Sequence, residues 1–295
     1  AKRSKIPLFL TQGFIETNTK PDAAFDFWNG LSGTENRAWF GQFDHWRGWE
    51  KNEAGKYYTG RKVFMAEVMR FFDQHLKGKS AATQKDPSIA VQDILGRYRA
   101  EVAWPPADSK THWTELNVGT YSDDRSNTTL GGRGLWSVSQ TLPHDVWLSG
   151  EPVVEVTADA FPRSNVVVNL YDIAPNGDSL PISRGTMMFR DEGSQTVRFD
   201  MYGQDAPIDK GHRIGVLISG ANTDWWGLDV PTNQEISVDE ARIGLPFLTF
   251  ARTRFLDGKI TPDLRDYRSE VAATSKGTIK NGAAKFSLPG PLRKR

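Results

Sequence analysis

Ile6-Pro7-Leu8-Phe9-Leu10-Thr11-Gln12-Gly13 is the stretch from which the fold class can be predicted. It is apolar almost throughout and ends at glycine, which is typical of a strand buried on both faces in a parallel sheet. Lys20-Pro21-Asp22 then opens a helical pattern that closes at Gly33, and a second apolar run follows over residues 38–41. A strand, a helix and a strand joined by short links predict an α/β arrangement.

The clearest helical pattern of the chain follows over residues 61–77, with Gly78 placed as its C-terminal cap. Five of its side chains have the spacing of one helix face: Phe64, Val68, Phe71, Phe72 and His75.

From residue 98 onward the pattern changes to short β-branched runs separated by turn signals such as Pro175-Asn176-Gly177-Asp178. Many short strands without a helical period predict an antiparallel β-sandwich or jelly roll. We therefore expect two domains, residues 1–97 and residues 98–295, with the all-β domain closed by a strand at residues 286–288.

Composition excludes several classes of function. Lys and Arg number 37 and Asp and Glu 36, so the net charge of +1 gives no general attraction to nucleic acid or to anionic membranes. No apolar run approaches the roughly 18 residues of a membrane span. The absence of cysteine removes disulfides, thiolate nucleophiles and Cys-ligated zinc, and we expect neither a metal nor another cofactor. Cellular compartment is left open.

Two loops at expected strand ends carry side chains suited to acid–base chemistry. The first holds Glu16 and the second holds His45, 29 residues later with one helix between them. Parallel strands bring such loops to one edge of a sheet, where a carboxylate can orient an imidazole as in a Ser–His–acid triad. The spacing alone equally allows a helix-capping Glu16 and a structural His45. Asp44 is a weaker candidate for the orienting acid, because adjacent side chains in an extended segment point apart.

Several motifs, in order along nearly the whole chain, resemble the X-Pro dipeptidyl-peptidase (S15) and cocaine-esterase-like (CocE/NonD) family. They are Gly13-Phe14-Ile15-Glu16-Thr17-Asn18-Thr19-Lys20-Pro21, Gly41-Gln42-Phe43-Asp44-His45, Phe72-Asp73-Gln74-His75-Leu76-Lys77-Gly78, the link over residues 91–105, the hairpin over residues 166–185, and Gly211-His212-Arg213-Ile214. The resemblance implies that residues 1–97 are the C-terminal portion of an α/β-hydrolase catalytic domain. It also implies that His45 is the catalytic histidine and Glu16 its acid.

The chain departs from that family pattern in two ways. Glu16 stands where the family usually has Asp, and no Gly-x-Ser-x-Gly nucleophile elbow occurs in the sequence. We therefore expect the nucleophilic serine to lie on the N-terminal part of the same hydrolase, upstream or on a partner chain. Two or three parallel strands alone leave an open edge, which also indicates such a partner.

Aromatic residues provide candidates for substrate binding: Trp46 and Trp49 after His45, and Trp225 and Trp226 in the second domain. A packed aromatic loop and a packed core are the alternatives for the two pairs. The expected function is cleavage of an amide or ester in a peptide or small molecule by a peptidase, esterase or acylase through an acyl-enzyme, and a homo-oligomer is compatible with this. The alternative is a non-catalytic carbohydrate- or partner-binding module.

Overall fold

A computed structural model of the chain describes residues 5–19, 21–33, 35–79, 86–128, 132–226, 230–269 and 282–294. Its contacts divide the chain into two compact units. Unit 1 comprises Ala1–Ala107 and Arg252–Tyr267, and unit 2 comprises Asp108–Ala251 and Arg268–Arg295. Residues 98–107 and 252–267, which the sequence assigned to the second domain, thus group with unit 1. No helix in the described ranges is long and apolar enough to cross a membrane.

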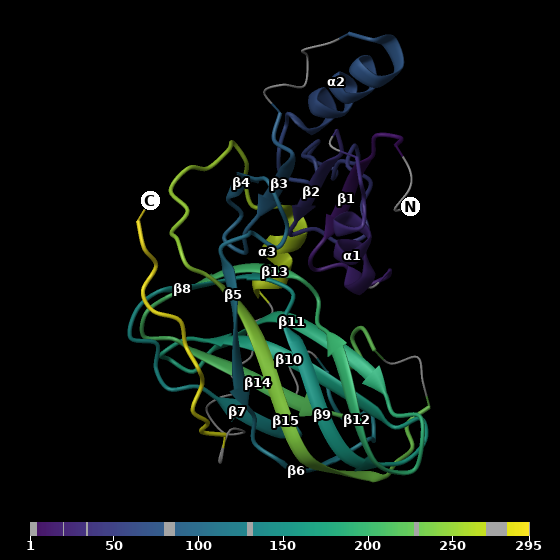
Figure 1. The fold of residues 1–295 in the computed structure, drawn as a ribbon, viewed down its shortest axis with the longest axis vertical. Helices are drawn as coiled ribbons and strands as arrows, with labels where there is room; N and C mark the ends of the chain where they lie inside the picture. The colour runs from purple at the N-terminus through teal and green to yellow at the C-terminus, as the bar shows by residue number, and fades with distance from the viewer. Residues whose placement is uncertain are drawn as a thin grey trace. The chain divides into compact units, whose positions relative to one another are not determined.

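Unit 1 is built on a four-stranded sheet in the order β1-β2-β3-β4, in which β1, β2 and β3 are parallel and β4 is antiparallel to β3 (Figure 1). Its elements are β1 (Phe9–Gly13), a short 3₁₀ helix (Pro21–Ala23), α1 (Ala24–Asn29), β2 (Arg37–Gly41), α2 (Phe64–Lys77), β3 (Ile89–Gln92), β4 (Tyr98–Glu101) and residues 262–267 of α3 (Pro262–Ser269).

The two faces of this sheet carry separate aromatic clusters, because successive side chains of β2 point to opposite faces. Phe40 packs against Phe25 of α1 on one face, with ring centroids 5.0 Å apart. Trp39 packs against Phe64 of α2 on the other face at 4.8 Å. Helix α2 ends at Gly78, whose φ of 65° is the left-handed conformation that glycine tolerates best. The parallel strands are thus covered on both faces by helices.

Burial in unit 1 departs from the sequence pattern in two places. Ile6 is 73% exposed, because the strand begins only at Phe9 and β1 pairs with β2 along one edge in the described sheet. Phe72 is 45% exposed, whereas Glu67 is buried on the inner face of α2. The indole of Trp39 donates a hydrogen bond of 2.8 Å to Glu67 Oε2. This bond places Glu67 on the face of α2 that packs against the sheet.

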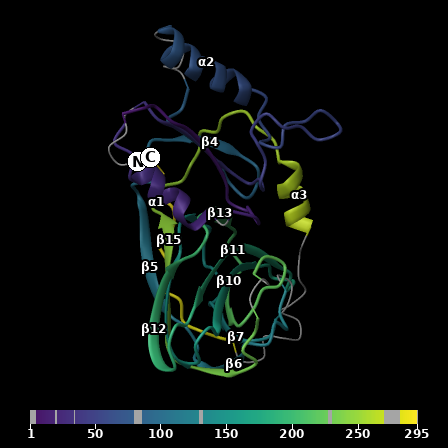
Figure 2. The same ribbon diagram turned by 90° about the vertical axis from the view of Figure 1, so that its right-hand side faces the viewer.

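Unit 2 consists of two antiparallel sheets, one of four strands in the order β11-β10-β14-β7 and one of seven strands centred on β15. Figure 2 views them from the side. The strands are β5 (Ser109–Glu115), β6 (Gly119–Ser122), β7 (Leu135–Val138), β8 (Val146–Gly150), β9 (Val153–Ala160), β10 (Asn165–Ile173), β11 (Ser179–Met188), β12 (Gly193–Asp200), β13 (Gln204–Ile208), β14 (Arg213–Ser219) and β15 (Glu235–Leu248).

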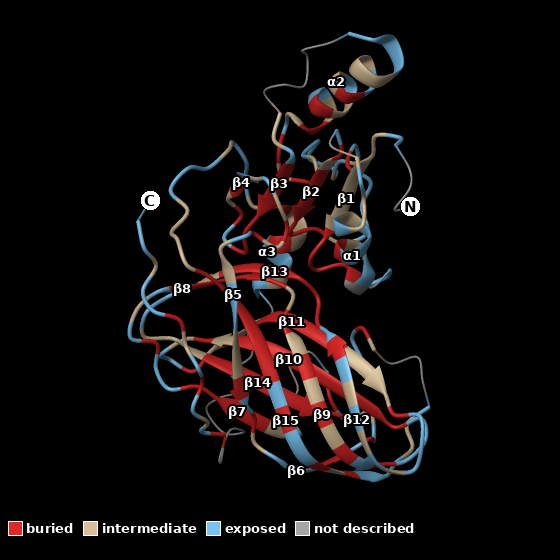
Figure 3. Cartoon of the chain, in the orientation of Figure 1, coloured by how far each residue is buried: buried red, intermediate tan, exposed pale blue. Residues whose placement is uncertain are grey.

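Burial differs between the two sheets of unit 2 (Figure 3). Along β9 and β12 buried or half-buried residues alternate with more exposed ones, as expected for a sheet with one face in solvent. Strand β10 is buried along almost its whole length, in keeping with its central place between β11 and β14. The strand expected at residues 286–288 is not formed, because this segment joins the sheets only through isolated bridges at Ala283 and Arg293.

Candidate active site

The loop that follows β1 is held close to the loop that follows β2. Gly13 lies so near the second loop that a β-carbon on it would be 1.8 Å from the carbonyl oxygen of Phe43. Only glycine fits there without a backbone shift. The amide of Phe14 donates to the carbonyl of Gly41 at 2.8 Å, which continues the parallel pairing of the two strands beyond their ends. This approach places Glu16 beside His45.

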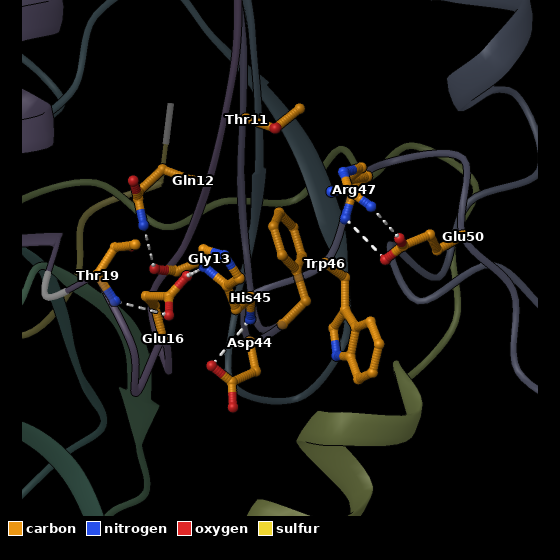
Figure 4. Close-up of a pocket in the computed structure, with 11 residues that line it drawn as sticks. Thr11, Gln12, Gly13, Glu16, Thr19, Asp44, His45, Trp46, Arg47 and Glu50 are labelled. Atoms are coloured by element: carbon orange, nitrogen blue, oxygen red, sulfur yellow. Dashed lines mark hydrogen bonds and ion pairs between the residues drawn. The ribbon is translucent and has the colours of Figure 1, made fainter. Parts of the chain in front are cut away.

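Glu16 and His45 form a hydrogen-bonded pair, with 2.9 Å between Glu16 Oε2 and His45 Nδ1 (Figure 4). The distance is within the roughly 3.2 Å limit of a hydrogen bond. The acid side chain is 5% exposed and the imidazole 56% exposed, so the carboxylate supports the ring from the interior while the ring remains accessible. The other carboxylate oxygen, Oε1, accepts hydrogen bonds from the amides of Asn18 at 2.7 Å and Thr19 at 3.0 Å.

These contacts favour the ionised form of Glu16 and select the tautomer of the imidazole. Burial by itself would raise the pKa of Glu16, but the hydrogen bonds from Thr19, Asn18 and His45 outweigh burial and hold that pKa below its ordinary value. The carboxylate is therefore ionised at neutral pH. An ionised carboxylate can only accept hydrogen bonds, so Nδ1 of a neutral His45 carries the proton and Nε2 keeps a lone pair. This is the tautomer that a general base requires.

The pair opens onto a pocket of about 310 Å³. It is lined by Thr11, Gln12, Gly13, Glu16, Thr19, Phe43, Asp44, His45, Trp46, Arg47 and Glu50. The Trp46 ring stacks on Tyr58 with ring centroids 4.0 Å apart, which fixes one wall. Arg47 Nη1 lies 3.1 Å from Glu50 Oε1, so opposite charges meet at the wall of the pocket. The lining combines an apolar surface with polar groups, as small-molecule sites do.

Asp44 does not orient the imidazole. Its carboxylate accepts hydrogen bonds from the amide of Thr17 at 2.8 Å and from the amide of His45 at 2.8 Å. It also accepts from the Thr17 hydroxyl. Asp44 therefore ties the histidine loop to the loop that carries Glu16.

The four tryptophans proposed as substrate-binding residues occupy different environments. Trp46 lines the pocket, whereas Trp49 is exposed and is not among the lining residues. Trp225 and Trp226 lie in unit 2, where they pack with Val167 and Tyr202. Trp225 is 6% exposed, so its ring is part of the interior of unit 2, the alternative that the sequence left open.

Two parts of the site were missed by sequence reasoning. Gln92 at the end of β3 accepts a hydrogen bond of 3.0 Å from the amide of Gln42, at the base of the histidine loop. Asp263 of α3 accepts one of 2.8 Å from the amide of Asp44, 219 residues away. Thr261-Pro262-Asp263 has the pattern of a helix start, but nothing local indicates where that helix docks. No group of three or more metal-ligating side chains was found in the described ranges.

Comparisons with known proteins place the larger part of the chain in a family. The family model of the X-Pro dipeptidyl-peptidase C-terminal non-catalytic domain matches residues 80–259. No curated protein sequence matches the chain.

Solved structures share the fold at low sequence identity. A CocE/NonD family hydrolase from Staphylococcus aureus is 11% identical with a TM-score of 0.65, over 83% of this chain and 54% of that protein. An aminopeptidase from a marine sediment archaeon, Thaumarchaeota archaeon, is 12% identical with a TM-score of 0.65, over 84% and 56%. An α-amino acid ester hydrolase is 16% identical with a TM-score of 0.58, over 83% and 55%. The chain thus spans just over half the length of these proteins.

The family expected from the sequence motifs is confirmed by the matched model and by the fold that the chain shares with CocE/NonD hydrolases. The matched segment takes in more than half of the 295 residues, and Glu16 and His45 precede it. The chain belongs to the family of X-Pro dipeptidyl-peptidase C-terminal non-catalytic domains.

Proposed function

We propose that the chain is the C-terminal portion of a serine hydrolase and supplies the acid and the histidine of its catalytic triad. In this proposal residues 1–97 belong to an α/β-hydrolase domain, and unit 2 is a jelly roll of the galactose-binding-like kind. The observation that carries the proposal is the 2.9 Å contact between Glu16 and His45, with a buried, ionised acid and an accessible imidazole.

The proposed mechanism uses the ionised acid and the Nδ1–H tautomer of the imidazole. A serine on the N-terminal part of the hydrolase attacks the carbonyl carbon of the substrate, and His45 Nε2 takes the proton from its hydroxyl. The imidazolium then gives this proton to the leaving amine or alcohol, which departs and leaves an acyl-enzyme. A water molecule deacylates the serine by the same route. Glu16 holds the tautomer and stabilises the imidazolium throughout.

Two facts support the involvement of a further part of the hydrolase. Strand β1 lies at an edge of the described sheet, and a parallel sheet edge of this kind favours another strand beside it. The solved relatives are almost twice as long as the part that the chain covers. The partner in this proposal is the N-terminal part of the same enzyme, which carries the nucleophilic serine.

The relatives and the pocket support a proposal for the substrate class. The structural relatives include an aminopeptidase and an α-amino acid ester hydrolase, so we propose a peptide or small-molecule substrate with an amide or ester bond. Trp46 offers an apolar wall for the acyl group, and the Arg47–Glu50 pair offers polar contacts.

A second function is favoured by the description of the matched family domain as non-catalytic. In that case the chain is a carbohydrate- or partner-binding module, and the Glu16–His45 contact is structural. The assembled hydrolase, this chain together with the N-terminal part, distinguishes the two. We expect His45→Ala to abolish hydrolysis of an aminoacyl p-nitroanilide and of a p-nitrophenyl ester. Unchanged hydrolysis of both would favour the binding module.

A further inference from the structure

The segment that follows β15 returns to unit 1 and contacts the histidine loop, residues 42–46. The Thr261 hydroxyl donates a hydrogen bond to the carbonyl of Gln42. Asp263 Oδ2 accepts a hydrogen bond of 2.8 Å from the amide of Asp44, and the carboxylate also accepts one from the Trp46 side chain. One carboxylate therefore holds the residues on both sides of His45.

The position of Asp263 is fixed by its own helix. The Thr261 hydroxyl accepts a hydrogen bond of 3.0 Å from the amide of Leu264, and the Thr261 carbonyl accepts one of 3.1 Å from Arg265, so Thr261 caps the start of α3. Leu264 is fully buried and anchors this first turn in unit 1. The cap is thus supplied by Thr261, and the Asp263 carboxylate is available to the histidine loop.

Two carboxylates therefore restrain His45 in different ways. Glu16 binds the imidazole at Nδ1 and sets the orientation of the ring. Asp263 binds the backbone amide of Asp44, before His45, and the indole of Trp46, after it. It therefore fixes the position of the backbone that carries the imidazole. We propose that Asp263 is a positioning residue of the triad, which holds the His45 loop so that Nε2 meets the serine. This inference rests on the proposed function of the Glu16–His45 pair.

The two hydrogen-bond donors offset part of the cost of burying the Asp263 carboxylate. Burial raises the pKa of Asp263, and the nearby carboxylates of Asp44 and Asp266 add to this, while the hydrogen bonds from Asp44 and Trp46 oppose it. Removing the acceptor would take this partner from the backbone amide of Asp44 and from the indole of Trp46. Because a misplacement of about 1 Å costs an enzyme roughly 100-fold in rate, a small shift of this loop has a large effect.

The test uses the assembled hydrolase with four variants. Asp263→Ala removes the acceptor, Asp263→Glu keeps the charge but displaces it by one methylene, and Asp263→Asn keeps an acceptor oxygen but removes the charge. Asp266→Asn, on the exposed side of the same helix, is the control. The measurements are kcat and KM for a p-nitrophenyl ester, the thermal midpoint, and the ¹⁵N-histidine NMR signal of the His45 Nδ1–H group.

We expect kcat to fall about 10- to 100-fold in Asp263→Ala and Asp263→Glu, with KM changed less than about twofold. The Nδ1–H signal should broaden or shift in both. Asp263→Asn should retain kcat within about fivefold, and the control should match the wild type. Asp263→Glu keeps an acid in the first helical turn and so should fold even where Asp263→Ala does not.

The proposal is overturned if all Asp263 variants keep the wild-type kcat and His45 signal. It is also overturned if Asp263→Glu is active and Asp263→Asn is not, because charge rather than position would then be what matters. His45→Ala separates this failure from that of the proposed function. If His45→Ala is fully active the triad assignment fails, whereas if it is inactive and the Asp263 variants are unaffected only the present inference fails.

Discussion

Unit 1 and unit 2 each contain a histidine paired with a carboxylate at Nδ1. His45 Nδ1 lies 2.9 Å from Glu16, and His212 Nδ1 lies 2.7 Å from Asp172. The surroundings differ. The Glu16 side chain is 5% exposed beneath an imidazole that is 56% exposed, whereas the side chains of Asp172 and His212 are similarly covered, at 17% and 22%.

The two acids also differ in their electrostatics. Backbone amides help to hold the pKa of Glu16 below its ordinary value in spite of burial. Burial raises the pKa of Asp172, with a further increase from Asp209, and the contact with His212 only partly offsets this. Asp172 lies in β10 and His212 immediately precedes the paired strand β14, so the second pair bridges neighbouring strands. A short His–acid distance thus identifies a candidate site only together with an accessible ring and an acid whose hydrogen bonds outweigh its burial.

The largest expected difference between the two regions concerns the histidines. In the assembled hydrolase, His45→Ala should lower kcat by roughly 10³- to 10⁶-fold, since it would remove the proposed general base. His212→Ala should change kcat less than about twofold. Steady-state hydrolysis of a p-nitrophenyl ester measures both. Equal effects of the two substitutions on kcat would contradict the assignment of a catalytic role to His45 and not to His212.

Substitution of the two acids should also affect kcat only in unit 1. Glu16→Gln should lower kcat by about 10²- to 10⁴-fold, because the amide cannot stabilise the imidazolium and permits the wrong tautomer. Asp172→Asn, the matched change in unit 2, should leave kcat unchanged. The ¹⁵N shifts of His45 provide a check, since they should report loss of the Nδ1–H tautomer in Glu16→Gln only. A fully active Glu16→Gln enzyme would contradict the triad assignment.

Two glycines beside these pairs provide a test through stability. Gly13→Ala puts a β-carbon 1.8 Å from the Phe43 carbonyl, so we expect a loss of about 3 kcal/mol in unfolding free energy, together with displacement of the Glu16 loop. Gly211, before His212, has a φ of 88°, and a β-carbon on it would lie 3.9 Å from Pro175 Cγ, an ordinary contact distance. Gly211→Ala should therefore cost only about 1 kcal/mol, the cost of a left-handed conformation. Urea denaturation of both variants measures the loss of unfolding free energy. Equal losses would show that the close approach of Gly13 to the Phe43 carbonyl does not require glycine at this position.

The smallest expected effect is an opposite pH dependence of stability. Glu16 has a lowered pKa when folded, so its contribution is present above the unfolded pKa, near 4.5, and is lost as the pH falls through the folded value. Asp172 has a raised pKa when folded, so its ionisation reduces stability as the pH rises above 3.8. The stability deficit of Glu16→Gln relative to wild type should therefore shrink on acidification. Asp172→Asn should become more stable relative to wild type as the pH rises. Denaturation curves between pH 3 and 7 measure both stability differences. A pH dependence of the same sign for the two carboxylates would contradict this prediction.

Local sequence predicted the elements that are built from neighbouring residues. The apolar run ending at Gly13, the second run ending at Gly41 and the cap at Gly78 gave strands and a helix near the expected bounds. The loops after the two strands gave Glu16 and His45, because parallel strands bring successive loops to one edge of a sheet.

Features that depend on distant contacts could not be predicted in this way. Phe72 has the helical spacing of a buried residue, but Glu67 takes the inner face through its bond to Trp39, which a hydrophobic pattern does not reveal. Asp263 reaches the histidine loop across 219 residues. The apolar Phe286 suggested a closing strand, yet a side-chain amide satisfies its backbone instead, since Gln140 accepts from its amide and donates to its carbonyl.

The most direct test of the Glu16–His45 assignment is labelling of the assembled hydrolase with a fluorophosphonate, which reacts only with an activated serine. We predict that the probe modifies a serine outside residues 1–295, identified by peptide mass spectrometry, and that His45→Ala slows the labelling by at least about 10³-fold. His212→Ala should label at the wild-type rate. A labelled serine within residues 1–295, or wild-type labelling of His45→Ala, would contradict the account.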